Sequence, residues 1–217
     1  MSDTEKTPTR RGGWKRDPEK VRQDILRAAT EEFAKHGFNG GRVDRIAQLT
    51  ETSKRMIYYY FGDKEGLWRA VLEEAYCEIR LQETDLDLAG LSPVAALRKL
   101  FLFTFDHHRR NEAFIRLIMI ENIRGGQVLA SSDRIRELNR PIIDVLTEIC
   151  RRGAENGCLR SDLVPLELHW QLSAVSFFNM SNRATFSGIF GDELFSETAQ
   201  DILRDRLADQ FLRMVSA

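Results

Sequence analysis

The sequence predicts an all-α protein, with three short N-terminal helices, a connecting helix and a larger C-terminal helical body. Three observations support this prediction. Apolar residues recur every three or four positions along most of the chain, which is the spacing of one helix face. Asp17-Pro18 and Ser92-Pro93 each place a capping side chain before a proline at the first helical position. We find no run in which apolar and polar residues alternate as they do along a half-buried strand.

The charges are divided unevenly along the chain. Residues 1–64 carry 14 Lys and Arg against 10 Asp and Glu, a net charge of +4. The rest of the chain carries 18 Lys and Arg against 23 Asp and Glu, a net charge of −5. A basic N-terminal part joined to an acidic remainder indicates an anion-binding module on a carrier that does not bind anions.

Cysteine usage and hydropathy exclude several classes of protein. Cys77, Cys150 and Cys158 are odd in number and lack the spacing of metal ligands, so we expect reduced thiols in the cytoplasm. A redox pair formed by Cys150 and Cys158 has no other support in the sequence. We find no secretory segment and no apolar run near 18 residues, so we expect no membrane insertion.

Residues 1–62 predict an arm followed by three helices. Residues 1–16 are polar, contain glycine and end in basic residues, which predicts a flexible basic arm. Residues 17–62 form the first predicted domain. Asp17 caps a helix whose apolar stripe ends at Gly37. A shorter helix covers residues 43–49, and after a tight turn a third helix runs from 53 to 61.

Residues 63–217 predict a second, larger helical domain. Asp63 caps a long helix that connects it to the first domain. We expect Pro141 to kink or break the helix over residues 131–152, and the segment LELHWQLSAVSFFNMSNRATF to form one helix. The remaining helix starts are at Ser92-Pro93, at EAFIRLIMIENI, at Pro165 and at Ser196, the last helix reaching Val215.

The third predicted helix divides into two faces. Ile57 and Phe61 are four residues apart, so they share one face and pack inward. Arg and Lys bind phosphate or guanine and phenols donate to phosphate, so the other faces are suited to DNA. Two short helices joined by a tight turn are also the arrangement of a helix-turn-helix. The outward residues are Lys54, Arg55, Met56, Tyr58 and Tyr59, with Tyr60 at a margin.

The segment ILRAATEEFAKHGFNGGRVDRIAQLTETSKRMIYYYFGDKEGLWRAVL, residues 25–72, resembles the DNA-binding domain of the tetracycline-repressor (TetR) family of bacterial transcriptional regulators. The shared pattern is A-x-x-x-F-x-x-x-G-F, then I-A, then S-K-x-x-I-Y-Y-Y-F-x-x-K-E-x-L, which is long enough to be specific. The resemblance implies that the third helix enters the major groove of a double-stranded operator. It implies DNA contacts by Arg42, Ser53, Lys54, Arg55, Met56, Tyr58, Tyr59, Tyr60 and Lys64.

Two positions depart from the family pattern. Gly41-Arg42 stands where the family has Thr or Ser at the head of the second helix, so the Arg42 side chain or bare helix amides replace the phosphate-binding cap. Glu51 stands where the family has Gly in the turn. In a left-handed conformation Glu51 costs about 1 kcal/mol relative to Gly, and its carboxylate lowers the expected operator affinity.

The resemblance also implies a C-terminal domain that binds a small-molecule effector in a cavity with apolar walls and a few polar groups. The competing interpretation is a plain hydrophobic core. His107-His108 with Glu112 does not predict a metal site, because adjacent helical residues diverge by about 100°; we expect no metal and no cofactor. The effector candidates are Phe101, Phe105, His108, Met119, Asn122, Trp170, Phe177 and Asn179.

The resemblance further implies a homodimer that pairs the last two helices of each copy. The same residues would serve equally well if the final helix packs against its own domain. The dimer candidates are Ile202, Leu203, Leu207, Phe211, Leu212 and Val215.

The predicted function is that of a cytoplasmic, ligand-responsive transcriptional regulator, a repressor released from a palindromic operator by its effector. Two alternatives are kept. One is a helical protein-interaction module without a DNA role. The other is a small-molecule enzyme in the C-terminal body, although we find no G-x-S-x-G, H-E-x-x-H, P-loop or dinucleotide motif.

Overall fold

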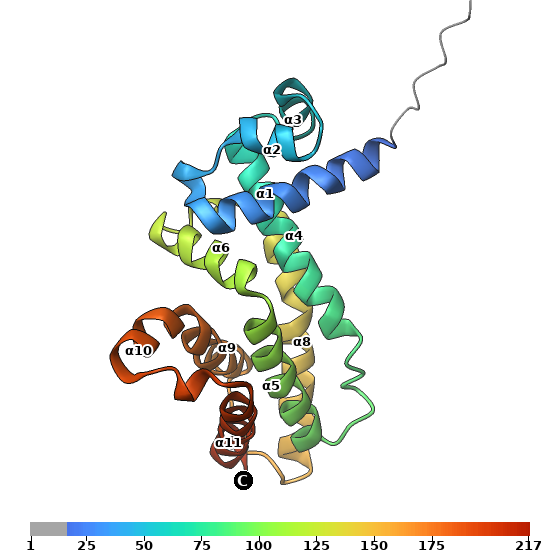
Figure 1. Cartoon of the computed structure of the whole chain (residues 1–217). Coiled ribbons are helices and arrows are strands. Elements are labelled where there is room, and N and C mark those ends of the chain that lie inside the picture. Colours follow the sequence, from blue (N-terminus) through green and yellow to red (C-terminus); the bar gives the residue numbers. More distant parts are fainter. Residues whose placement is uncertain (1–16) are drawn as a thin grey trace, which may run out of the picture.

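The computed structural model describes residues 17–217, and the predicted arm, residues 1–16, lies outside the described residues. Within the described part the fold is helical without named strands, which confirms the predicted all-α class (Figure 1). The elements are α1 (Pro18–Gly40), α2 (Val43–Leu49), α3 (Lys54–Phe61), α4 (Lys64–Thr84), α5 (Pro93–Arg110), α6 (Glu112–Ile123), α7 (Gln127–Ser131), α8 (Asp133–Glu155), α9 (Pro165–Ser181), α10 (Arg183–Phe190), the 3-10 turn η1 (Glu193–Phe195) and α11 (Glu197–Val215).

Local capping sets the starts of the N-terminal helices. The Asp17 carboxylate accepts a hydrogen bond at 3.0 Å from an amide in the first turn of α1. Ser53 Oγ accepts from the Met56 amide at 3.2 Å, and Asp63 Oδ1 accepts from the Gly66 amide at 2.7 Å. Each bond satisfies an N–H that has no acceptor within its own helix. The starts of α1, α3 and α4 therefore agree with the sequence prediction.

Gly37 interrupts α1 at the position where the sequence predicts the end of the first helix, and a short second helical segment follows it. Its φ of 72° and ψ of 174° are non-helical, and the helical assignment then continues to Gly40. The Gly41 amide donates to the Gly37 carbonyl at 2.9 Å, which holds the chain back against α1. A Cβ on Gly41 would lie 2.5 Å from the Phe33 ring, so the close approach requires glycine there.

The hydrophobic core of the N-terminal domain extends into the C-terminal body. Phe33 of α1 and Trp68 of α4 meet edge to face, with ring centroids 5.2 Å apart. Leu117 of α6 and Ile135 of α8 belong to the same buried cluster. In Figure 1, α6 lies directly beneath α1. The helix-turn-helix domain is therefore packed onto the body through a shared core.

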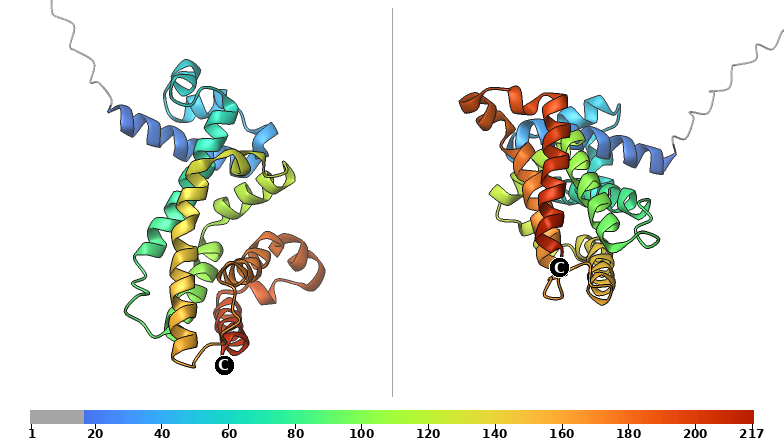
Figure 2. Two further views of the ribbon diagram at one scale, coloured as in Figure 1. Left: turned by 180° about the vertical axis from the view of Figure 1, so that it is seen from behind. Right: turned by 90° about the horizontal axis from the view of Figure 1, so that it is seen from below.

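A second core holds the lower part of the body together. It is built from α5, α8, α9 and α11 around Leu97, Leu100, Leu146 and Leu172. The long helices α4 and α8 run side by side and join the two ends of the molecule (Figure 2). This frame places the C-terminal ends of α4 and α8 far from the helix-turn-helix (Figure 1).

Three elements differ from the prediction. The segment expected to form one helix from Pro165 divides at Asn182 into α9 and α10, and α10 is held by a Phe186–Phe195 ring contact with η1 at 6.1 Å. Helix α7 was not predicted. Helix α8 continues through Pro141, because the loss of one amide donor does not outweigh packing along the rest of its length.

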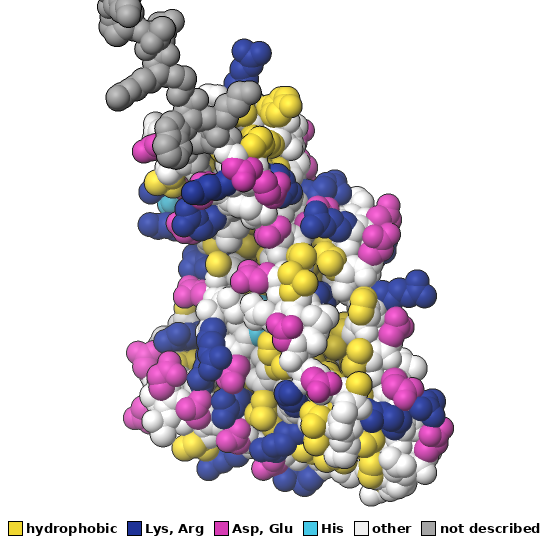
Figure 3. Space-filling model, turned by 90° about the vertical axis from the view of Figure 1, so that its right-hand side faces the viewer, with side chains coloured by type: hydrophobic (Ala, Val, Ile, Leu, Met, Phe, Trp, Pro, Cys, Tyr) yellow, Lys and Arg dark blue, Asp and Glu magenta, His cyan; other side chains and the backbone are white. Residues whose placement is uncertain are grey.

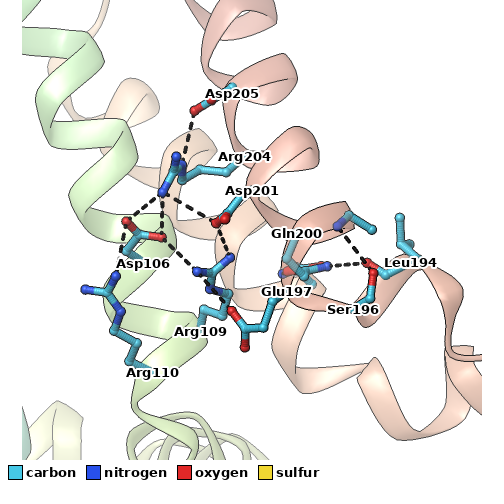
Figure 4. Close-up of polar contacts among 12 residues, drawn as sticks. Asp106, Arg109, Arg110, Leu194, Ser196, Glu197, Gln200, Asp201, Arg204 and Asp205 are labelled. Carbon is cyan, nitrogen blue, oxygen red and sulfur yellow. Dashed lines mark hydrogen bonds and ion pairs between the residues drawn. The ribbon is translucent and has the colours of Figure 1, made fainter.

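Helix α11 is tied to α5 by an ion-pair network (Figure 4). Arg109 donates to Asp201 Oδ1 at 2.8 Å. Arg204 donates to Asp106 Oδ2 at 3.1 Å, so each helix supplies both a cation and a carboxylate. Arg109, Asp106 and Arg204 are partly buried and Asp201 is about half exposed, so the network lies at the edge of the contact between the two helices. The buried Phe211 and Val215 supply the apolar contact beneath them.

Candidate DNA-binding surface and effector cavity

The turn between α2 and α3 has the backbone geometry expected of a helix-turn-helix. Thr50 Oγ1 donates to the Ile46 carbonyl at 2.8 Å and closes the end of α2. Glu51 follows with φ of 48°, in the left-handed region that favours glycine. The structure therefore retains the glycine conformation at this position with a glutamate side chain.

Helix α3 presents one buried and one exposed face, as its spacing predicts. Ile57 is fully buried, whereas Lys54 and Arg55 are exposed. Tyr59 projects furthest, with 78% of its surface exposed. The two neighbouring tyrosines and Phe61 are half-buried against the core, so Phe61 packs inward only in part.

Lys54 is already paired within the protein. Its Nζ lies 3.2 Å from Asp44 of α2 and 5.9 Å from the centroid of the Tyr58 ring. Because Lys54 and Asp44 are both exposed, the pair contributes little stability and can open at low cost. Arg55 forms no ion pair with another described residue and is the exposed cation most available to a phosphate or a base.

The start of α2 is held from α1 by a buried carboxylate that the sequence prediction missed. Glu32 is 4% exposed, and its Oε1 accepts a hydrogen bond from the Arg42 amide at 3.1 Å. Its Oε2 pairs with Arg45 Nε at 3.3 Å. The Arg42 side chain makes no capping bond to α2 and is exposed. The position of this glutamate within the apolar stripe of α1 could have predicted from the sequence that its carboxylate is buried and paired.

Lys64, a predicted phosphate contact, is turned toward the protein. Its Nζ donates to the Asn39 carbonyl at 3.3 Å and lies 4.9 Å from the centroid of the Phe38 ring. Burial, and secondarily the nearby Arg124, lowers the pKa of the Lys64 ammonium. Its side chain would have to leave the Asn39 carbonyl to reach a phosphate.

A cavity of about 510 Å³, open to solvent beside the exposed Leu166 and Trp170, lies in the body between α4, α5, α6, α7, α8 and α9. Four of the eight predicted effector residues line it: His108, Asn122, Trp170 and Phe177. Their helices converge only in three dimensions. The remaining lining residues are Tyr76, Ile79, Arg80, Glu83, Thr104, Phe114, Ile118, Leu129, Ile135, Asn139, Leu166, His169, Ser173 and Ala174.

The other four predicted effector residues lie outside this lining. Phe101 and Phe105 are buried in the second core, where Phe101 contacts the Phe211 ring at 5.4 Å between centroids. Asn179 exchanges two hydrogen bonds with Gln200 of α11, at 2.7 and 3.2 Å. Met119 of α6 is half-buried and does not line the cavity. Helical spacing alone does not distinguish the side of a helix that faces a core from the side that faces a cavity.

Arg80 and Glu83 form the charged centre of the cavity. The two side chains pair with each other on consecutive turns of α4, and Arg80 Nε donates to Asn139 Oδ1 at 3.0 Å. Burial raises the pKa of the Glu83 carboxyl, although Arg80 opposes that effect. Arg80 and Glu83 lie on the same side of α4 as Tyr76 and Ile79, which also line the cavity. Charged residues on the inward side of this helix could have predicted a polar cavity from the sequence.

The cavity also holds neutral histidines. Burial lowers the pKa of His108 to about 3 and that of His169 to about 4, with a further contribution from the positive charge of Arg80. Among the described residues, the Nδ1 atoms of both imidazoles are buried without a hydrogen-bond partner. Buried polar atoms of this kind mark a place where a bound molecule can form a missing bond.

Helix α6 connects the cavity to the DNA-binding domain. Glu121 is 0% exposed and accepts hydrogen bonds from Trp68 Nε1 at 2.8 Å and from the Val128 amide at 2.7 Å. Arg124 donates to both oxygens of Glu65 at 2.8 and 3.0 Å. The neighbouring positions on α6 line the cavity, so one helix contacts both regions.

The predicted dimer residues are placed mostly inside their own domain. Phe211 and Val215 are buried in the second core, and Leu203, Leu207 and Leu212 pack against it. Of the six predicted dimer residues, Ile202 alone is exposed. The large apolar residues exposed on α9, α10 and η1 are instead Leu166, Trp170, Val175, Phe178, Ile189, Phe190 and Leu194.

A second hollow, a groove of about 830 Å³, lies between α4 and α8. Leu81, Val145 and Ile149 contribute to its apolar lining, and Arg134 and Glu148 lie at charged positions around it. Hydrophobic side chains are visible among charged ones on this side of the molecule (Figure 3). Within residues 17–217 no helix is long and apolar enough to cross a membrane, and no three potential metal ligands cluster.

Both halves of the chain match families of bacterial regulators. Residues 25–71 match "Bacterial regulatory proteins, tetR family", and residues 93–210 match "Tetracyclin repressor-like, C-terminal domain". The chain is 33% identical over 195 residues to the HTH-type transcriptional repressor NicS of Pseudomonas putida, covering 90% of this chain and 92% of that protein.

Two further similarities agree with these matches. The HTH-type transcriptional repressor AcnR of Corynebacterium glutamicum is 42% identical over 194 residues, covering 87% of this chain and 95% of that protein. A tetR-family regulatory protein from Rhodococcus RHA1 has the same fold, with a TM-score of 0.71 at 22% identity over 90% of this chain and 97% of that structure. The chain therefore belongs to the tetR family of bacterial regulatory proteins.

Proposed function

We propose that this protein is a cytoplasmic, homodimeric transcriptional repressor that binds a palindromic operator through α3 and is released from it by a small-molecule effector. The observation that carries the proposal is the exposed face of α3, with Arg55 and Tyr59 outward and Ile57 buried beneath them. Curated relatives such as NicS and AcnR are repressors by name, which supports the direction of the response.

The DNA-binding step uses two recognition helices in successive major grooves. In a symmetric dimer these helices must lie about 34 Å apart to read two half-sites one turn apart. Arg55 supplies a cation for a phosphate or a guanine, and Tyr59 supplies a hydroxyl and a ring. The Lys54–Asp44 pair opens when a phosphate replaces the carboxylate.

The dimer uses the exposed apolar side of α9 and α10, extended by Ile202 of α11. Phe178, Ile189 and Phe190 are each more than half exposed, and together with Ile202 they resemble an uncovered interface core. The Phe178→Glu variant should be a monomer, and light scattering measures its mass. Leu81→Glu, at an equally exposed apolar position on α4, is the matched control and should leave the mass unchanged.

Helix α6 couples effector binding to DNA release. Phe114, Ile118 and Asn122 line the cavity, whereas Glu121 and Arg124 of the same helix contact α4 and the end of α1. An effector that binds better to a shifted position of α6 favours a dimer whose α3 spacing no longer fits the operator.

The test is a salt titration with duplex DNA that the protein selects from a random pool. Affinity should fall steeply with salt, and the double substitution Lys54→Ala/Arg55→Ala should weaken binding about tenfold to a thousandfold. Arg140→Ala, an exposed arginine on α8, is the control and should bind as the wild type does. Selection of no sequence, or binding indifferent to salt, would contradict the proposal.

A further inference from the structure

We propose that the effector is a small aromatic or heteroaromatic monocarboxylic acid, with its ring between the aromatic walls of the cavity and its carboxylate on Arg80. This inference rests on the proposed function, because it identifies the chemical class of the effector. Three features of the cavity support it: the ring cluster in its wall, a single guanidinium with free donors, and two unpartnered imidazoles.

The wall of the cavity is a connected set of rings from four helices. Tyr76 of α4 meets Phe114 of α6 edge to face at 5.7 Å between centroids. His108 of α5 stacks on Phe114 at 5.8 Å and meets Phe177 of α9 edge to face at 6.2 Å. Ring faces and edges that are already arranged favour a planar ligand, since offset-stacked and edge-to-face contacts are the preferred aromatic geometries.

Arg80 is the one Lys or Arg among the described lining residues. Its side chain is 12% exposed, with Nε bound to Asn139 and Nη1 to Glu83. No described residue accepts a hydrogen bond from Nη2, so part of the guanidinium fork is available. A carboxylate is the group whose geometry matches such a fork.

The Arg80–Glu83 pair sets the charge that the ligand can carry. Glu83 balances the positive charge of Arg80, and burial makes the ionised form of Glu83 unfavourable, which raises its pKa. A ligand carboxylate can therefore replace Glu83 on the guanidinium while Glu83 takes up a proton. One arginine accommodates one carboxylate, so a ligand with several carboxylates would bring uncompensated charge beside the buried Arg80–Glu83 pair.

The imidazoles offer further polar contacts to the ligand. His108 is 5% exposed and lacks a partner for Nδ1, as does His169. Their lowered pKa values keep both rings neutral at pH 7, so each can donate from one nitrogen and accept at the other. A ring hydroxyl or ring nitrogen would satisfy them, whereas a fatty-acid chain would leave them unpaired.

The test measures binding to the full-length dimer by calorimetry, using benzoate, 4-hydroxybenzoate and 2-naphthoate as probes. At least one should bind, and benzamide and cyclohexanecarboxylate should bind about tenfold more weakly than benzoate or not at all. Equal binding of benzoate and benzamide would overturn the role of Arg80, and failure of all three acids to bind would overturn the inference.

Substitutions of charged residues identify the cavity in which the acid binds. Arg80→Gln alone leaves Glu83 buried without its cation, so the double variant Arg80→Gln/Glu83→Gln keeps the pair neutral and preserves folding. It should lose about tenfold in affinity for the acid that binds and no longer distinguish benzoate from benzamide. Arg134→Gln, in the α4–α8 groove, is the control; weakening there in place of the double variant would overturn the assignment to this cavity.

His108→Phe keeps the ring and removes the nitrogen atoms. It should reduce the preference for 4-hydroxybenzoate over benzoate, and an unchanged preference would remove the imidazole from the recognition of the ring substituent.

A parallel measurement of DNA binding, with and without the acids, distinguishes a failure of this inference from a failure of the proposed function. Acids that bind through Arg80 without releasing selected DNA would support the ligand class and contradict effector control. Tight, salt-dependent DNA binding by a protein that binds none of the acids would contradict the ligand class and leave the regulator intact.

Discussion

The DNA-binding surface and the effector cavity are built in opposite ways. The surface comes from one short stretch, residues 42–64, in which each side chain is presented by its own helix or turn. The cavity takes residues from α4, α5, α6, α7, α8 and α9, separated by up to about a hundred positions in the chain. A surface of this kind follows from local spacing, whereas the cavity exists only after the helices have packed.

The two regions also treat charge differently. Lys54 and Arg55 stand in solvent, where an ion pair such as Lys54–Asp44 contributes little and can exchange with phosphate. Arg80 and Glu83 are withdrawn from solvent, where an unpaired partner would be costly. The surface is therefore expected to bind DNA by exchanging an internal ion pair for a phosphate contact. The cavity is expected to bind its ligand through hydrogen bonds that its buried polar groups lack.

The largest expected effect on stability and DNA binding comes from a substitution where α3 meets α4. A Cβ on Gly66 would lie 1.9 Å from the Phe61 carbonyl oxygen, so Gly66→Ala forces the two helices apart. We expect a loss of about 3 kcal/mol in the free energy of unfolding, measured in urea, and loss of DNA binding.

Gly188→Ala is the matched control for that change. Nothing lies within 4 Å of a Cβ at this position of α10, and an alanine there favours the helix. Its free energy of unfolding should rise by about 0.5–1 kcal/mol. A Gly66→Ala protein as stable as the wild type would show that the joint tolerates the alanine.

The next effect concerns α6, where the two regions meet. Glu121→Ala leaves the Trp68 indole N–H and the Val128 amide buried without an acceptor. We expect a loss of about 2–3 kcal/mol in the free energy of unfolding and a weakened response of DNA binding to effector. Glu112→Ala, on the exposed side of α6, should change stability by less than about 0.5 kcal/mol.

A third effect is confined to the cavity and appears as a pH dependence. The folded pKa of His108 is about 3, below its ordinary value of 6.5, so the unfolded chain binds the proton first. The stability contributed by neutral His108 is present above pH 6.5 and declines as the pH falls toward 3. Between pH 6.5 and 5 this costs about 1–2 kcal/mol.

His108→Phe should flatten that decline. Glu83, whose pKa is raised by burial, titrates in both proteins and largely cancels in their difference. Urea unfolding of both proteins at pH 7.5, 6.5 and 5 gives the comparison. Parallel curves for wild type and variant would show that His108 does not carry the effect.

The smallest expected effect is local to the DNA-binding surface. Glu51 occupies φ of 48°, so Glu51→Gly removes backbone strain and should raise the free energy of unfolding by about 1 kcal/mol. Operator affinity should also increase, since a carboxylate leaves the surface, while binding in the cavity stays constant. A less stable glycine variant would mean that the contacts of the Glu51 side chain outweigh the strain.

Particular residues show how far prediction from sequence reached. The caps at Asp17, Ser53 and Asp63 were predicted because each bond joins residues within one turn. Half of the predicted cavity residues line the cavity, and Phe101 and Phe105, which have the same helical spacing, are core. Periodicity gives the inward side of a helix but not which neighbour it meets.

By itself the sequence determined the all-α class, the helix-turn-helix and the division of α3 into an inner and an outer face. These depend on hydrogen bonds and side-chain directions within one or two turns. Only the tertiary structure decided that Glu32 holds α2, that Arg80 and Glu83 share a cavity with His108, and that α11 turns Phe211 inward. Those outcomes depend on which helix faces meet, and the lowest-energy packing of all the helices selects them together.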